Sequence, residues 1–105
     1  MKLNYEVGSF TNDKGQAVSY DKFFVNIFLN DIDYKLPIKI EEKFLKSQVK
    51  ENIETAVIVL ESTENSKKET VYKPYVSFKM GAAEMKQPVT VTVADLFILR
   101  LYNCN

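Results

Sequence analysis

The sequence predicts a small α+β domain that is mostly β, folded as an antiparallel β-barrel or β-sandwich with one helix. Apolar residues alternate with polar ones along most of the chain, which is typical of strands with one buried face. Helical spacing replaces the alternation only at residues 41–54. The length of 105 residues predicts a single domain, residues 1–105, and we find no internal repeat in the sequence.

Three strands are expected before the helix, at residues 3–7, 19–29 and 34–40. The intervening segments, residues 12–15 and 30–33, are rich in Asn, Asp and Gly, which favour turns. Pro37 has no N–H to donate to a strand ladder. We therefore expect the third strand to lie at a sheet edge or to contain a bulge.

One helix is expected at residues 41–54, because four apolar residues fall on one helical face: Phe44, Leu45, Val49 and Ile53. Glu41 and Glu42 lie at its N-terminal end, where the helix dipole favours negative charge. They are interpreted as partners of the dipole and not as catalytic acids.

Strands are expected again after the helix. Residues 55–60 contain a continuous apolar run, which predicts a strand buried on both faces. A polar turn at 61–68 leads to an alternating strand at 70–80. Residues 81–88 are predicted as a loop, and the alternation of Val89, Val91 and Val93 predicts a further strand.

The segment 94–102 has two interpretations. It either continues the preceding strand past a bulge or forms a short helix capped by Thr92, with Asp95 at capping-box spacing. The β pattern that runs into this segment favours the strand.

The predicted element order is β-β-β-α-β-β(-β). In the OB-fold, a five-stranded Greek-key barrel, a helix lies between the third and fourth strands. The helix expected at 41–54 falls in that place, so an OB-like arrangement is the leading expectation. Another small barrel or sandwich is the alternative. The analogy concerns element order alone, and fold does not imply function.

Composition argues against the common enzyme classes. The chain has no His and one Cys, so the familiar catalytic triads and zinc sites cannot form within it. Gly-rich phosphate loops are absent as well. Asp31 and Asp33 are interpreted as a solvated turn and not as a cation site. We expect a protein without enzymatic activity, metal or cofactor.

The N-terminus shows no apolar signal-peptide core, and no apolar run approaches the roughly 20 residues of a membrane span. We therefore expect a cytoplasmic protein without a membrane partner. Cys104, the only cysteine, is expected to be a free thiol in a reducing compartment.

Aromatic residues and lysines share the strand faces opposite the aliphatic ones, a combination that suits single-stranded DNA or RNA. Bases stack on aromatic rings, and lysines meet phosphates. Covered packing, beneath the C-terminal segment or in a dimer, is the favoured interpretation for Phe24 and Phe28, and both interpretations stay open for Tyr20 and Tyr75. The candidate residues are Tyr20, Lys22, Phe24, Asn26, Phe28, Lys35, Lys39, Lys73, Tyr75 and Lys79.

The net charge is zero, with 14 basic and 14 acidic residues, which gives no overall attraction to nucleic acid. The acidic excess is concentrated in residues 41–69, and the strands with the aromatic residues are mildly basic. The expected function is a small binding module for single-stranded nucleic acid.

The alternative function is a structural or interaction protein of a phage or mobile element that self-associates through strand edges or the aromatic patch, as a homo-oligomer. The strong preference for Lys over Arg, with Arg100 as the only arginine, and the many Asn and Ile residues are consistent with AT-rich coding.

Overall fold

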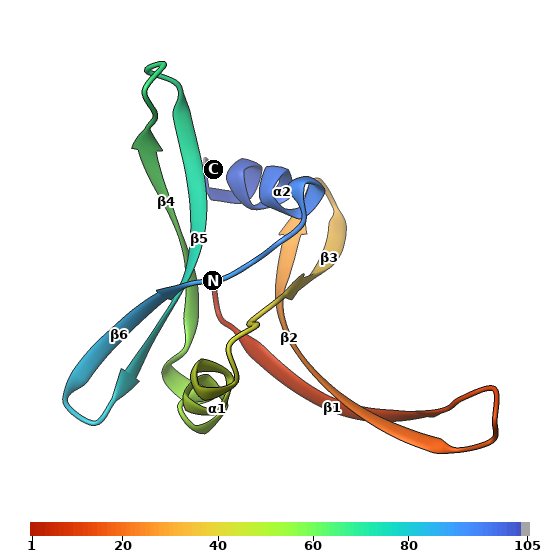
Figure 1. Ribbon diagram of the computed structural model, residues 1–105. Helices are drawn as coiled ribbons and strands as arrows, with labels where there is room; N and C mark the ends of the chain where they lie inside the picture. The colour runs from red at the N-terminus through yellow and green to blue at the C-terminus, as the bar shows by residue number, and fades with distance from the viewer. Residues whose placement is uncertain (104–105) are drawn as a thin grey trace.

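The computed structural model describes residues 1–103 and contains two three-stranded antiparallel sheets and two α-helices (Figure 1). The first sheet has the order β1-β2-β3, formed by Asn4–Thr11, Ala17–Leu29 and Ile32–Ile38. The second has the order β4-β5-β6, formed by Val57–Glu64, Thr70–Met80 and Ala83–Pro88. Helix α1 spans Lys43–Glu51, and α2 spans Val93–Asn103. A short 3₁₀ turn, Ile53–Thr55, precedes β4.

This architecture confirms the mostly β, α+β class. Within residues 1–103 the strands form two separate sheets, and no closed barrel is found. Cys104, for which a free thiol was expected, lies outside the described residues.

The chain builds the same unit, β-β-β-α, twice in succession. Two isolated bridges join the units through matching parts. Lys2 pairs with Val57 at the start of the first strand of each unit, and Lys39 pairs with Thr90 just after the third. At the second bridge the two residues exchange N–H···O bonds of 2.9 and 3.0 Å. Reciprocal bonds between equivalent residues mark an approximate two-fold axis, so the expectation of no internal repeat is wrong for the structure.

The loops of the β1–β2 and β4–β5 hairpins repeat each other in detail. In each, the side-chain oxygen of an asparagine, Asn12 or Asn65, accepts bonds of 2.9–3.0 Å from the N–H groups two and four residues later. The residue three positions on has a positive φ, 76° at Gly15 and 62° at Lys68. The predicted turn at 12–15 is therefore confirmed, and its geometry does not depend on glycine.

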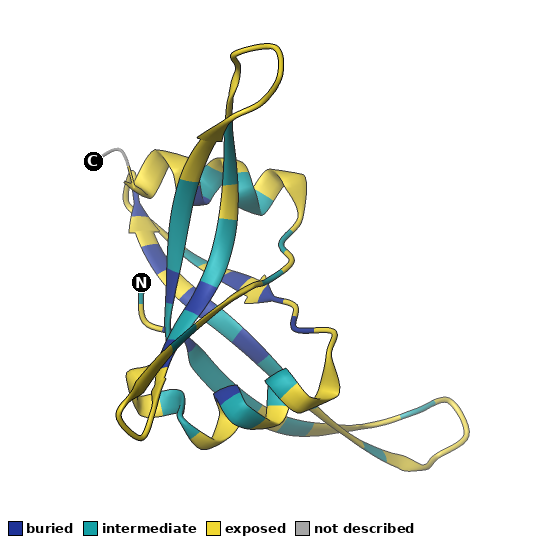
Figure 2. Cartoon of the chain, turned by 60° about the vertical axis from the view of Figure 1, so that its left-hand side comes forward, coloured by how far each residue is buried: buried dark blue, intermediate teal, exposed yellow. Residues whose placement is uncertain are grey.

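The hydrophobic core lies between the two sheets, and both units contribute to it. Figure 2 shows buried positions in the central parts of the strands, whereas the hairpin ends are exposed. Each helix adds one fully buried side chain, Val49 from α1 and Leu99 from α2. The strand residues of the core include Leu3, Phe23, Val25, Ile27, Leu36, Ile38, Ile58, Val76 and Phe78.

The strands expected at 19–29 and 70–80 match β2 and β5 closely, whereas β1 continues to Thr11 and β4 continues to Glu64, into the turn expected at 61–68. Strand β3 is an edge strand, as Pro37 predicted. The expected helix at 41–54 is shorter, because Glu42 is its N-cap and accepts bonds from the N–H groups of Phe44 and Leu45. The run at 55–60 is not buried on both faces, since β4 is also an edge strand and only Ala56 and Ile58 in this run are buried.

The predictions of a loop at 81–88 and of a strand at 89–93 were wrong, and of the two alternatives for 94–102 the helix is confirmed. Strand β6 replaces the expected loop and pairs with β5. Residues 89–92 form a connection in place of a strand, and α2 then begins at Val93. The Thr92 hydroxyl accepts the N–H of Asp95 at 3.1 Å, so the capping-box alternative is confirmed and the favoured strand is not.

Candidate nucleic-acid interface

Five of the candidate residues lie on one face of β2, directed away from the core. They alternate with Phe23, Val25 and Ile27, which are buried. The side chain of Phe28 is 61% exposed and Tyr20 is 39% exposed, so the described residues do not cover them. Phe24 is half-buried. We call this the outer face of the first sheet; its predicted members on β2 are Tyr20, Lys22, Phe24, Asn26 and Phe28.

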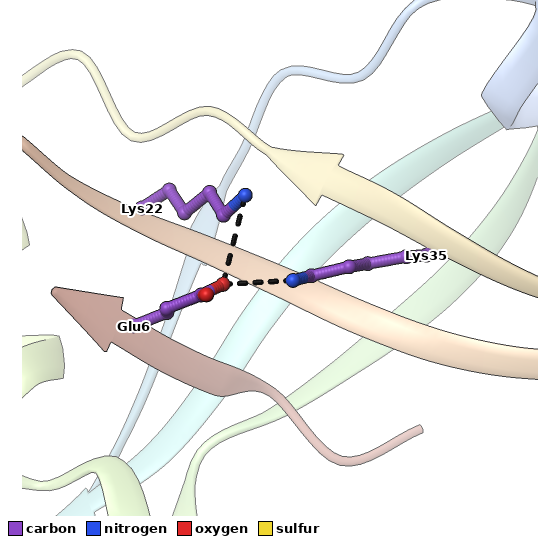
Figure 3. A network of polar contacts seen from close by, with 3 residues as sticks. All are labelled: Glu6, Lys22 and Lys35. Atoms are coloured by element: carbon purple, nitrogen blue, oxygen red, sulfur yellow. Dashed lines mark hydrogen bonds and ion pairs between the residues drawn. The ribbon is translucent and has the colours of Figure 1, made fainter. Parts of the chain in front are cut away.

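Strand β3 adds Lys35 to this face, opposite Asn26. The carboxylate of Glu6 on β1 forms ion pairs with both Lys22 and Lys35, as Figure 3 shows. Glu6 Oε2 lies 2.7 Å from Lys35 Nζ and 3.6 Å from Lys22 Nζ. The hydrogen bond from Lys35 is the main cause that lowers the pKa of Glu6, and the same bond raises the pKa of Lys35. Lys35 Nζ also lies 4.3 Å from the centre of the Phe24 ring, within cation–π range.

The aromatic surface continues towards the hairpin end through a residue that the sequence reasoning missed. Phe10 of β1 is 53% exposed, and its ring centre lies 6.3 Å from that of Tyr20. The Tyr20 ring rests on the backbone of Gly8, where an added Cβ would lie 2.4 Å from the Tyr20 hydroxyl. Phe10 was missed because the predicted strand ended at Val7, and a continued alternation pattern would have included it.

The candidate residues on β5 do not join this face. They belong to the second sheet, and the two sheets direct their buried faces towards one core, so their outer faces point away from each other. Lys86 of β6, also missed, lies with Nζ 5.0 Å from the Tyr75 ring centre and forms an ion pair with Glu61. The predicted members here are Lys73, Tyr75 and Lys79, in the outer face of the second sheet.

Lys39 belongs to neither outer face. It lies beyond the end of β3, at the bridge to Thr90, and its ammonium group is 3.7 Å from a Glu41 oxygen. A cavity of about 600 Å³ opens beside it. The three lysines that line this cavity, Lys22, Lys39 and Lys46, each have a carboxylate partner. Because none of these three lysines is unpaired, they do not indicate an anion-binding site in the cavity.

Comparison with protein families, with curated proteins and with solved structures finds no significant match for this chain. The geometry of the two faces is therefore the basis for a functional assignment. Among residues 1–103 no group of three metal-ligating side chains occurs. Neither α1 nor α2, the two helices in that range, has the length and apolar character needed to cross a bilayer.

Proposed function

We propose that this chain is a binding module for single-stranded nucleic acid and that the outer face of the first sheet holds the strand. The observation that carries the proposal is a set of aromatic side chains with exposed surface, Phe10 of β1 and Tyr20 and Phe28 of β2, on one face of the first sheet beside Lys22 and Lys35. Stacking on these rings requires unpaired bases, because the bases of a duplex already stack on one another.

The two lysines supply the contact to phosphate. Both are bound to Glu6 in the free protein, and a phosphate oxygen would replace the carboxylate as their partner. With two phosphate contacts on a single strand, the logarithm of the binding constant should fall with a slope of about −1.4 against the logarithm of salt concentration. Affinity should therefore fall about 25-fold for each tenfold rise in salt.

The fold supports this proposal without requiring an OB barrel. The feature of this chain that matches the element order of an OB-fold is the position of α1 between the third and fourth strands. The absence of His and the paired state of the cavity lysines fit a binding role better than catalysis.

Fluorescence anisotropy with labelled oligo-dT at low salt tests the proposal. We expect saturable binding that weakens with salt. On a Tyr75→Leu background, which removes the ring on the outer face of the second sheet, Lys22→Ala combined with Lys35→Ala should give a much shallower salt slope. Lys43→Ala combined with Lys67→Ala is the matched control for loss of two exposed lysines. Absence of binding, or binding that ignores salt, would contradict the proposal.

A second candidate function is self-association, as a structural or interaction protein of the kind expected from a phage or mobile element. It is favoured by an exposed apolar stripe on α2, formed at intervals of four residues by Val93, Phe97 and Leu101, which are 87%, 57% and 43% exposed. Light scattering tests this candidate, because the measured mass can be compared with the 12.1 kDa of a monomer. We expect an oligomer that Phe97→Ser dissociates, with Phe44→Ser on α1 as the control. A monomeric wild type excludes this candidate.

A further inference from the structure

The two outer faces carry the same arrangement of side chains. Site A, on the first sheet, consists of Glu6, Lys22, Phe24, Lys35 and Pro37. Site B, on the second sheet, consists of Glu61, Lys73, Tyr75, Lys86 and Pro88. In each, the first strand supplies Glu, the middle strand supplies Lys-x-aromatic, and the third strand supplies Lys-x-Pro.

The strand registers place these residues in equivalent positions. In site A, Glu6 lies opposite Lys22, and Phe24 lies opposite Pro37. The pairs in site B follow the same pattern: Glu61 lies opposite Lys73, and Tyr75 lies opposite Pro88. The match therefore extends across all three strands of each sheet.

The contacts within the two sites also correspond. The third-strand lysine forms an ion pair with the glutamate in both, Lys35 with Glu6 and Lys86 with Glu61. The same lysine lies over the aromatic ring in both, with Nζ 4.3 Å from the ring centre in site A and 5.0 Å in site B. Each site thus holds one aromatic ring, two lysines and one carboxylate on a single sheet face.

The side chains of the two sites match more closely than those at neighbouring positions, so the match is not a simple consequence of the repeated backbone. Two places from the aromatic residue, towards the β2–β3 or β5–β6 turn, Asn26 corresponds to Ser77, and two places further Phe28 corresponds to Lys79. Elsewhere, Lys46 of α1 forms an ion pair with Asp21, whereas the corresponding turn of α2 carries Leu96. At these neighbouring positions the side chains differ between the units even though the backbone repeats.

We infer that the chain has two separate sites for single-stranded nucleic acid and holds two segments at once, one on each outer face. This inference rests on the proposed function. Because one core separates the faces, a short segment on site A does not reach site B. The protein would therefore link two strands, or two distant stretches of one strand.

Native mass spectrometry of the full chain with oligo-dT of about eight nucleotides tests the inference; this length lies within the roughly 4–16 nucleotides that one small β-domain covers. At an oligonucleotide concentration a few-fold above the wild-type Kd, we expect two oligonucleotides per chain for the wild type. Phe24→Leu and Tyr75→Leu should each weaken one of the two binding events by about 5-fold to 30-fold, and the double variant should weaken both. Phe44→Leu, an exposed ring on α1, should still bind two. Thermal melting checks that the variants are folded.

A second readout uses a mixture of donor-labelled and acceptor-labelled oligonucleotides. Two sites on one chain should give energy transfer, and either single variant should reduce it at the same oligonucleotide concentration. Saturation of the wild type at one oligonucleotide, or two bound by Tyr75→Leu with wild-type affinity, would overturn the inference and leave the proposed function in place. Failure of the wild type to bind any oligonucleotide would overturn both.

Discussion

Replacement of Phe24 by Leu tests whether site A binds through stacking. Leucine keeps an apolar side chain of similar bulk on β2 and removes the aromatic face. The change is best made on a Tyr75→Leu background, so that the signal comes from the first sheet alone. Phe24 lies outside the core, so the variant should keep its fold.

The expected magnitude follows from the surroundings of the ring. Base–aromatic stacking contributes about 1–3 kcal/mol per base, which corresponds to a loss of about 5-fold to 150-fold in affinity. Phe24 is half-buried, and Lys35 Nζ lies 4.3 Å from its centre and must move before a base can stack. We therefore expect a loss in the lower part of this range, about 5-fold to 30-fold.

The assay is a series of anisotropy titrations at several salt concentrations. Phe24→Leu should lower affinity by the same factor at each concentration, because it changes no charge. Lys35→Ala should instead reduce the salt slope by about 0.7. An unchanged affinity for Phe24→Leu would refute the assignment of stacking to this ring.

Three further predictions concern the groups around the sites and the fold. Glu6→Gln should bind oligo-dT several-fold more tightly at low salt, because it frees Lys22 and Lys35, and an unchanged affinity in the same titration would count against competition by the carboxylate. The hydrogen bond from Lys46, followed by that from Tyr5, lowers the pKa of Asp21 from its ordinary value of 3.8. The stability that ionised Asp21 provides is therefore present above pH 3.8 and is lost as the pH falls towards the lower pKa of the folded state. Asp21→Asn should make thermal stability less dependent on pH below about 5, and equal acid sensitivity would refute this. Thr92→Ala should cost about 1 kcal/mol by removing the cap of α2, with a matching fall in melting temperature, whereas Thr92→Ser should be nearly neutral.

The strands of the first unit could be predicted from the sequence because each has one buried and one exposed face. In β2 the buried residues Phe23, Val25 and Ile27 alternate without interruption with residues that are half-buried or exposed. Strand β6 gave no such signal, since Met85 is its only residue that is even partly buried. An edge strand that packs one side chain cannot be distinguished from a loop by periodicity.

The C-terminal helix was missed for a different reason. Val89 and Val91 are half-buried in an extended connection, and Val93 continues their alternation although it begins α2 and is 87% exposed. The informative signal was the spacing of Thr92 and Asp95. Local capping chemistry decided the structure at this point, and the apolar pattern did not.

The candidate site was predicted in composition and only partly in arrangement. The outer face of β2 carries the expected residues. The residues of β5 lie on the other sheet, and this could not be predicted without knowing which strands pair. The repeat escaped notice because the spacing between counterparts shortens along the chain, from Lys2 and Val57 to Lys39 and Thr90. A comparison at a fixed period does not find such a repeat.

The joining of two similar units in one chain has a consequence for how the protein can change. In a dimer of identical subunits every substitution appears twice, so each alteration of a surface alters both ends of the assembly. Here a substitution appears once. Helix α1 makes a charged contact to Asp21, whereas Phe97 and Leu101 of α2 are exposed to solvent. A chain of two similar units can therefore have two matching sheet faces and still present different surfaces on its two helices.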